Sequence, residues 1–452
     1  MREILFSRAY RRNVVGKNGR KDALEKTPPA FDFDKGGVLQ RAVGFEVEVS
    51  RYKLFRNEEQ YWEEQHSGDS FHPYGLTLPK FNKGEVLLSG GDFEFQADHQ
   101  GDPDSMPYLE IVTAPFGENS EGYYHLQACF DNIESIIAEL VAKSQENGGL
   151  VSLSGLHGDL RVPSYNRAAK IMVDQEAIGN FQITAGVRLD QLRTLFEETI
   201  MSKEGLESSG VSKLNFPWRP IFISLISKVE DALQRTQMSF STLPLSEAFW
   251  GLLHMIGLYT LSSSEPIEFY PKSFILFLAR TDFASMYHSL SMDDKQLLGQ
   301  NDLFVWKELT GSLLENLGLN NDDKPFFSEG VFLKTRPATF YNMMHSLKRK
   351  DWLENIPKGL DLLTQDHFPN PWRAYELESL GAMGSTMDRV GSKQQYLAPI
   401  FEFRSLMRRF HYRSWKQFAE NSFKMIYQLN RENDLQASET MPIPKPRRTL
   451  YC

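Results

Sequence analysis

The stretch Gly44-Phe45-Glu46-Val47-Glu48-Val49 alternates apolar and acidic residues. An alternation with a period of two predicts a β-strand. Its apolar side chains would then face one side, while Glu46 and Glu48 project from the other, about 7 Å apart along the strand. Neighbouring carboxylates repel each other, so a solvated face, basic partners or a divalent cation must compensate them.

Four later stretches repeat this alternation of polar and apolar residues, namely 93–98, 108–115, 181–187 and 400–405. In 181–187, neutral groups such as Gln182 and Thr184 take the places of the acids. Five such strands in one sheet would form a wall of acids with one arginine, backed by a hydrophobic layer. That recurrence favours a metal–nucleotide site, whereas any one strand alone is also compatible with an ordinary acidic surface.

Length and composition predict a large globular protein. The chain has 452 residues, 41% of them hydrophobic and 12% aromatic, which is ample for a core in one large or two ordinary domains. The formal net charge of −9 argues against general nucleic-acid binding, which needs clustered lysines and arginines.

The compartment expected from the sequence is the cytoplasm. Two cysteines, Cys129 and Cys452, are too few for a disulfide framework. Residues 1–20 are basic and lack the apolar core of a signal peptide, and the apolar segments 249–261 and 273–279 are too short to cross a bilayer. We therefore expect no membrane partner.

The order of the segments predicts an α+β fold with a mainly antiparallel sheet and helices packed behind it. We expect a basic flexible leader over 1–37, a catalytic domain over 38–435 and a proline-rich tail over 436–452. A large helical insertion over about 190–365 would separate the fifth strand from the last one.

Helical periodicity is clearest over 122–142, where apolar residues recur on one face. Another helix is expected over 412–432. We also expect a helix to begin at 270–273 and to continue into the apolar run 274–283.

Common catalytic motifs are absent from the sequence. It contains no GxxxxGK[ST] phosphate loop, no GxGxxG, no HExxH, no CxxC pair and no GxSxG. A nucleotide could instead be held through its metal ions.

Three acids are well placed to bind such ions: Glu46, Glu48 and Glu110. Mg²⁺ favours carboxylate oxygens and commonly bridges to substrate phosphates. Arg404 and Arg280 could stabilise a transferring phosphoryl group, because guanidinium pairs with its oxygens in a bidentate manner.

Two further acids, Asp98 and Glu402, are candidates for an outer layer of the site or for binding an amine. An ion pair that ends a core helix is an equally good interpretation of Arg280 and its neighbour Asp282.

The order GFEVE, LEIVTAP, a strand ending in Thr-Ala-Gly, then FEFR resembles the glutamine synthetase-like superfamily of carboxylate–amine ligases. That superfamily includes glutamine synthetase, glutamate–cysteine ligases, amidoligases and the actin cross-linking domains of bacterial toxins. The resemblance covers about thirty motif residues between 44 and 405. It implies a curved sheet as the active-site wall.

The resemblance also implies chemistry. Glu46, Glu48 and Glu110 would bind two or three Mg²⁺ ions, Gln182, Thr184 and Arg404 would contact ATP or its phosphates, and an amine would attack a phosphorylated carboxylate. Phosphorylation turns a poor leaving group into a good one. Asp98 or Glu402 would hold or deprotonate the incoming amine.

One residue departs from the family pattern, because Gln182 stands where many relatives have histidine. His157 could substitute from a loop, although a structural histidine is the commoner interpretation. Two kinds of ligase remain open: a biosynthetic amidoligase for small molecules or peptides, and an effector delivered into a host cell that modifies or cross-links a host protein such as actin. The alternatives from other classes are a catalytically silent scaffold and a phosphotransferase.

Overall fold

The structure is a computed structural model that describes residues 41–66, 80–98, 106–156, 158–174, 176–196, 219–262, 277–279, 281, 283–319, 349–358, 398–403 and 409–431. The chain divides into two compact units. The first comprises Met1–Lys35, Val43–Ile183 and Leu406–Phe423, and the second comprises Gly36–Ala42, Thr184–Ser405 and Lys424–Cys452.

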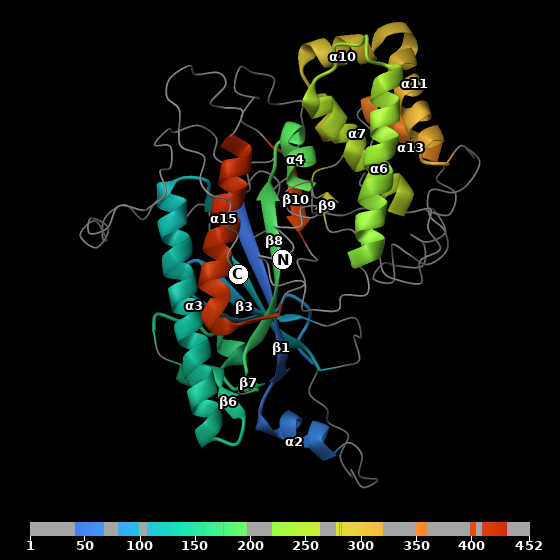
Figure 1. The fold of residues 1–452 in the computed structure, drawn as a ribbon. Coiled ribbons are helices and arrows are strands. Elements are labelled where there is room, and N and C mark those ends of the chain that lie inside the picture. Colours follow the sequence, from blue (N-terminus) through green and yellow to red (C-terminus); the bar gives the residue numbers. More distant parts are fainter. Residues whose placement is uncertain are drawn as a thin grey trace. The chain divides into compact units, whose positions relative to one another are not determined.

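An antiparallel sheet forms the centre of the first unit (Figure 1). Its strands follow the order β2-β3-β4-β1-β8. They are β2 (Val86–Ser89), β3 (Phe93–Asp98), β4 (Tyr108–Thr113), β1 (Ala42–Phe55) and β8 (Ile178–Gly186), with β8 continuing into the second unit. Short strands join at the margins: β5 (Phe116–Gly117), β6 (Leu150–Ser152), β7 (Lys170–Met172) and β11 (Arg409–His411). The α+β class and the mainly antiparallel sheet are confirmed.

One face of this sheet carries the hydrophobic core that the alternation in 44–49 predicts. Phe45, Val47 and Val49 are buried on β1. The ring of Phe45 meets the edge of Phe130 on helix α3 (Ser120–Glu146) at 5.5 Å between centroids. Phe181 on β8 packs against Phe418 of helix α15 (Trp415–Arg431) at 4.7 Å. The helix α3 and the first part of α15 therefore cover this face (Figure 1).

Helix α3 confirms the amphipathic pattern of 122–142. Its predicted apolar residues, including Cys129, are buried, and burial raises the pKa of the Cys129 thiol. The side chain of Asn119 caps the helix by accepting a hydrogen bond from Gly122 N at 2.7 Å. A Cβ on Gly122 would lie 1.9 Å from the carbonyl oxygen of Gly117, so only glycine fits where α3 starts.

One further α-helix and three 3₁₀ turns belong to the first unit. Helix α2 (Glu58–His66) follows β1, and short 3₁₀ turns cover Leu153–Gly155, Ser164–Asn166 and Tyr412–Ser414. Within β1 the pairing with β4 shifts between Glu48 and Lys53, and Arg51 there has a positive φ of 65°. This irregularity separates the paired acidic stretch from the end of the strand.

The second unit is mainly helical, as expected for the segment 190–365. Its helices are α4 (Leu192–Phe196), α6 (Arg219–Ser239), α7 (Glu247–Ser262), α9 (Phe283–His288), α10 (Met292–Leu298), α11 (Gln300–Asn316) and α13 (Arg349–Asn355), with 3₁₀ turns at Leu189–Gln191 and Ile356–Lys358. Gly251 on α7 packs against the backbone of Leu189, where a Cβ would approach the carbonyl oxygen to 1.9 Å.

The predicted helix through 274–283 is wrong at 277–279, which form a strand. Strand β9 (Phe277–Ala279) pairs antiparallel with β10 (Ile400–Phe403), so that Glu402 lies opposite Leu278. In a short run of apolar residues, periodicity cannot distinguish a buried strand from a buried helix. Here the pairing with β10 determines that the segment is a strand.

The leader 1–37 and the tail 436–452 lie outside the described residues. Among the helices that the structure describes, none combines the length and the apolar character needed to span a bilayer.

Candidate functional site

The polar face of the first unit's sheet brings together residues from four strands. Gln96 on β3 pairs with Glu110 on β4, and Glu110 pairs with Glu48 on β1. Gln182 on β8 continues this row, because its Nε2 donates a hydrogen bond to Glu48 Oε1 at 2.6 Å. The row lies on the opposite side of the sheet from Phe45 and Val47, as the alternation along β1 requires.

Three acids of this face form a compact group, which we call the acidic cluster: Glu48, Asp98 and Glu110. One carboxylate oxygen from each lies within 4.8 Å of the others. Asp98 is two residues beyond Gln96 along β3, and is therefore the diagonal neighbour of Glu110. Asp98 and Glu110 are buried and Glu48 is partly buried. Three converging carboxylates match the oxygen ligands that hard divalent cations prefer.

Gln182 supplies a second, independent indication of a ligand. The residue is 8% exposed, and its Oε1 accepts no hydrogen bond from any described residue. A buried amide oxygen without a donor is unfavourable, since it has lost its water and gained no partner. Because the Nε2 of the same amide contacts Glu48, this oxygen lies close to Glu48, a member of the acidic cluster, and a cation or a cation-bound water there would satisfy it.

A lysine contacts the cluster from the turn before β2. Lys83 Nζ forms an ion pair and hydrogen bond with Asp98 Oδ1. The Lys83 side chain is 53% exposed, whereas Asp98 is 8% exposed. The acidic cluster is thus paired with the ammonium group of Lys83, whose side chain extends from the solvent-exposed surface.

Glu94 and Gln96 extend the polar face along β3. Gln96 Nε2 donates to Glu94 Oε2 at 3.0 Å. Burial raises the pKa of the Glu94 carboxyl, and the hydrogen bond from Gln96 offsets part of that rise. Glu94 and Glu46 flank Val112 of β4 from its two sides.

The structure brings together some, but not all, of the residues that the sequence predicts as metal ligands. Glu48 and Glu110, two of the three predicted metal ligands, belong to the acidic cluster, and its third member is Asp98 instead of Glu46. The sequence predicts that Asp98 lies in an outer layer of the site or binds an amine, whereas its position beside Glu48 and Glu110 makes it a candidate cation ligand.

Two further predicted residues that the structure describes, Thr184 and Glu402, are not part of this group. Thr184 and Glu402 belong to the second unit, and Glu402 is fully buried there. Arg280, Arg404 and His157 lie outside the described residues.

Sequence reasoning missed Lys83 and Gln96. Gln96 stands in the alternating stretch 93–98. It could have been found because it is two residues before Asp98 and therefore on the same face of the strand. Lys83 lies in the turn Asn82-Lys83-Gly84, and only the pairing of β2 with β3 brings it to Asp98.

No protein-family model, no curated protein and no solved structure matches this chain.

Proposed function

We propose that this protein is an ATP- and Mg²⁺-dependent carboxylate–amine ligase that forms an amide or isopeptide bond. The observation that carries the proposal is the convergence of Glu48, Asp98 and Glu110 within 4.8 Å beside the unsatisfied amide oxygen of Gln182. The α+β architecture, with a polar sheet face opposite one covered by helices, is also compatible with a glutamine synthetase-like fold.

The acidic cluster fits a divalent cation by its chemistry. Carboxylates of Glu48, Asp98 and Glu110 offer charged oxygens, and Gln182 Oε1 offers a neutral one. A bound Mg²⁺ would neutralise triphosphate charge and orient the terminal phosphate for in-line transfer. The identity of the nucleotide, the acyl-phosphate route and the roles of Arg404 and Arg280 come from the sequence resemblance.

The residues around the cluster have defined tasks in this proposal. Gln182 holds Glu48 in one orientation through the 2.6 Å hydrogen bond from its Nε2 to Glu48 Oε1. The partial burial of the cluster strengthens its electrostatic interactions relative to those in water. Substrates would be a carboxylic acid and an amine, either free or on a protein side chain.

Phosphate release tests the proposal. Purified protein is incubated with ATP, Mg²⁺ and a mixture of amines and glutamyl peptides, and released phosphate is measured together with the product masses. We expect phosphate release and a product whose mass equals the two substrates minus one water. Glu48→Gln and Glu110→Gln should abolish both, whereas Glu59→Gln on the exposed side of α2 should keep them.

Three other results would each reject the ligase. Bound cation without turnover under any substrate mixture would indicate a silent scaffold. A stable phosphorylated product without free phosphate would indicate a phosphotransferase. Turnover that survives Glu48→Gln and Glu110→Gln would place the chemistry elsewhere in the chain.

A further inference from the structure

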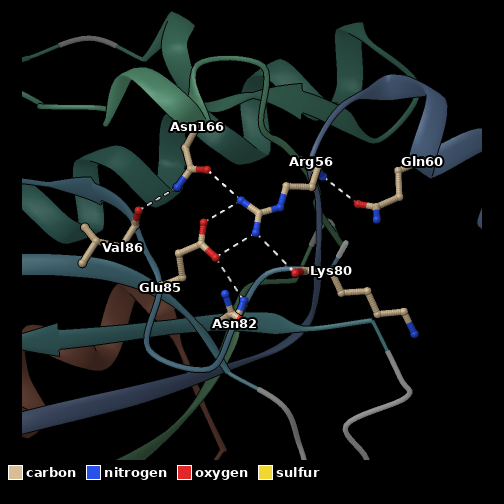
Figure 2. A network of polar contacts seen from close by, with 7 residues as sticks. All are labelled: Arg56, Gln60, Lys80, Asn82, Glu85, Val86 and Asn166. Atoms are coloured by element: carbon tan, nitrogen blue, oxygen red, sulfur yellow. Dashed lines mark hydrogen bonds and ion pairs between the residues drawn. The ribbon is translucent and has the colours of Figure 1, made fainter. Parts of the chain in front are cut away.

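The turn that carries Lys83 is held by a polar network around Arg56 (Figure 2). Arg56 Nη1 and Nη2 donate to the two carboxylate oxygens of Glu85 at 2.5 and 2.8 Å. The same guanidinium donates to Lys80 O at 3.3 Å and to Asn166 Oδ1 at 3.1 Å. One arginine therefore fixes both ends of the turn 80–85.

Further contacts fix the turn to the sheet and to a neighbouring loop. Asn166 is buried, and its Nδ2 donates to Val86 O at 2.9 Å. Asn82 N donates to Glu85 Oε2 at 3.0 Å, and Gly84 N donates to Ala97 O at 2.7 Å. These contacts hold the turn backbone against β2 and β3.

The charge of Glu85 belongs to this network. Burial raises the pKa of the Glu85 carboxyl, but the hydrogen bonds and charge of Arg56, with the Asn82 N–H and Asn166, lower the pKa by more, so the pKa lies below its ordinary value. Arg56 also lies 4.0 Å above the ring centroid of the buried Phe81. Both partners of the ion pair are largely shielded from solvent, since their side chains are 19% and 13% exposed.

The side chain of Lys83 is the part of this turn that reaches the acidic cluster. Its backbone is fixed between Asn82 and Gly84, while the side chain is half exposed and ends on the buried carboxylate of Asp98. Gly84 has a positive φ of 76°, which allows the sharp reversal that directs residue 83 toward β3. A flexible ammonium on a rigid base can leave Asp98 without any change in the fold.

We propose that Lys83 is a tethered counter-ion that occupies Asp98 in the cation-free site and is displaced from it when a divalent cation binds. The inference rests on the proposed function, because it takes the acidic cluster as the cation site. A divalent cation shared by Glu48, Asp98 and Glu110 competes with the ammonium for the same carboxylate. After displacement, Lys83 lies at the edge of the site, next to any anionic group that the cation carries.

Mn²⁺ affinity tests the competition. Free Mn²⁺ is followed by electron paramagnetic resonance in titrations of the full-length wild-type chain and of Lys83→Met at one fixed pH. Removing the competitor should tighten Mn²⁺ binding about threefold, the effect expected of one partly exposed ion pair. Lys83→Arg, which keeps the charge, should bind as the wild type does. Lys80→Met removes the same charge from the same turn and should leave the affinity unchanged.

A second measurement follows the lysine directly. Reductive methylation of the wild type, read by mass spectrometry of the peptide that contains Lys83, should proceed faster with Mn²⁺ than without it, since a displaced ammonium is more accessible. The lysines at 80 and 143 serve as internal references.

The outcomes separate the two proposals. If the wild type binds no Mn²⁺, the proposed cation site itself is wrong. If the wild type binds Mn²⁺ but Lys83→Met has equal or weaker affinity, the tethered counter-ion is wrong while the cation site stands. Methylation of Lys83 that is unchanged or slowed by Mn²⁺ also rejects displacement.

Discussion

Gln182 donates a hydrogen bond from Nε2 to Glu48 Oε1 at 2.6 Å, and this contact joins β8 to β1 at the acidic cluster. In this pair, a neutral residue contacts one of the acids of the cluster. An amide can hold a carboxylate by its N–H₂ and still offer an oxygen to a ligand. Histidine at this position would offer a single nitrogen once its other nitrogen had bound Glu48.

The Gln182–Glu48 contact leads to a prediction on cation-dependent stability. Gln182→Glu replaces the hydrogen bond by two neighbouring carboxylates, and we expect it to lower the free energy of unfolding by about 1–3 kcal/mol without divalent cations. Mn²⁺ should recover much of this loss, because an added carboxylate is a further cation ligand. Urea unfolding with and without Mn²⁺ measures both effects.

Gln182→Met is the matched control, since it removes the hydrogen bond without adding a charge. It should be destabilised, and Mn²⁺ should not rescue it beyond the wild-type response. Equal rescue of the two variants would contradict a direct role of position 182 at the cation.

The Arg56 network gives a prediction about local rigidity. Arg56→Lys loses the bidentate contact with Glu85 and the contacts with Lys80 O and Asn166, because an ammonium cannot reproduce the guanidinium geometry. We expect faster hydrogen exchange in peptides that cover 80–86, with α3 unchanged. Arg51→Lys, at an exposed ion pair with Asp174, should alter exchange little.

A partly buried carboxylate in the second unit, that of Glu230, makes stability depend on pH. Glu230 Oε1 lies 2.9 Å from His254 Nδ1, and Arg193 Nε donates to Glu230 Oε2 at 3.1 Å. Burial raises the pKa of the Glu230 carboxyl, but these two partners lower it by more, so the folded-state pKa is below the unfolded value. The stability from Glu230 is present above the unfolded-state pKa and is lost as pH falls through the folded-state pKa.

Glu230→Gln should therefore lower the free energy of unfolding by about 1–3 kcal/mol at pH 7. The difference from the wild type should shrink as the solution is acidified below pH ~4.5, the ordinary range of a glutamate pKa. Glu308→Gln, at an exposed position of α11, should show almost no difference at either pH. Denaturant titrations at several pH values make the comparison, and a pH-independent loss in Glu230→Gln would contradict the assignment.

Gly122 allows a test of packing at the start of α3. Gly122→Ala places a Cβ 1.9 Å from the Gly117 carbonyl oxygen, so the backbone must move, and we expect a loss of about 1–3 kcal/mol in unfolding free energy. Gly91→Ala meets no atom within 4 Å and should change stability by less than about 0.5 kcal/mol. Equal changes in the unfolding free energy of the two variants would contradict the close approach of Gly122 to the Gly117 carbonyl oxygen at the start of α3.

Much of the sheet could be predicted because each strand has its own periodicity. The alternation in 44–49 and 93–98 identifies both strands and the face that each buries, and Phe45 and Phe95 are indeed core residues. The helix over 122–142 follows in the same way from a single stripe of apolar residues.

The composition of the acidic cluster could not be predicted with equal success, because it depends on register between strands. The alternation of side chains along a strand places Glu46 and Glu48 on one face, but it does not determine which of them lies opposite Glu110. The pairing of Gln96 with Glu110 brings Asp98 into the cluster as a diagonal neighbour. Strand β9 was missed for a related reason, since its pairing with β10 joins segments more than a hundred residues apart.

Crystals grown with Mn²⁺ provide the most direct test that acids from separate strands hold one cation. Anomalous scattering from manganese should give a peak within coordination distance of Glu48, Asp98 and Glu110, with Lys83 moved away from Asp98. A saturating Mn²⁺ concentration that leaves this position without a peak, with Asp98 still paired to Lys83, would contradict the account.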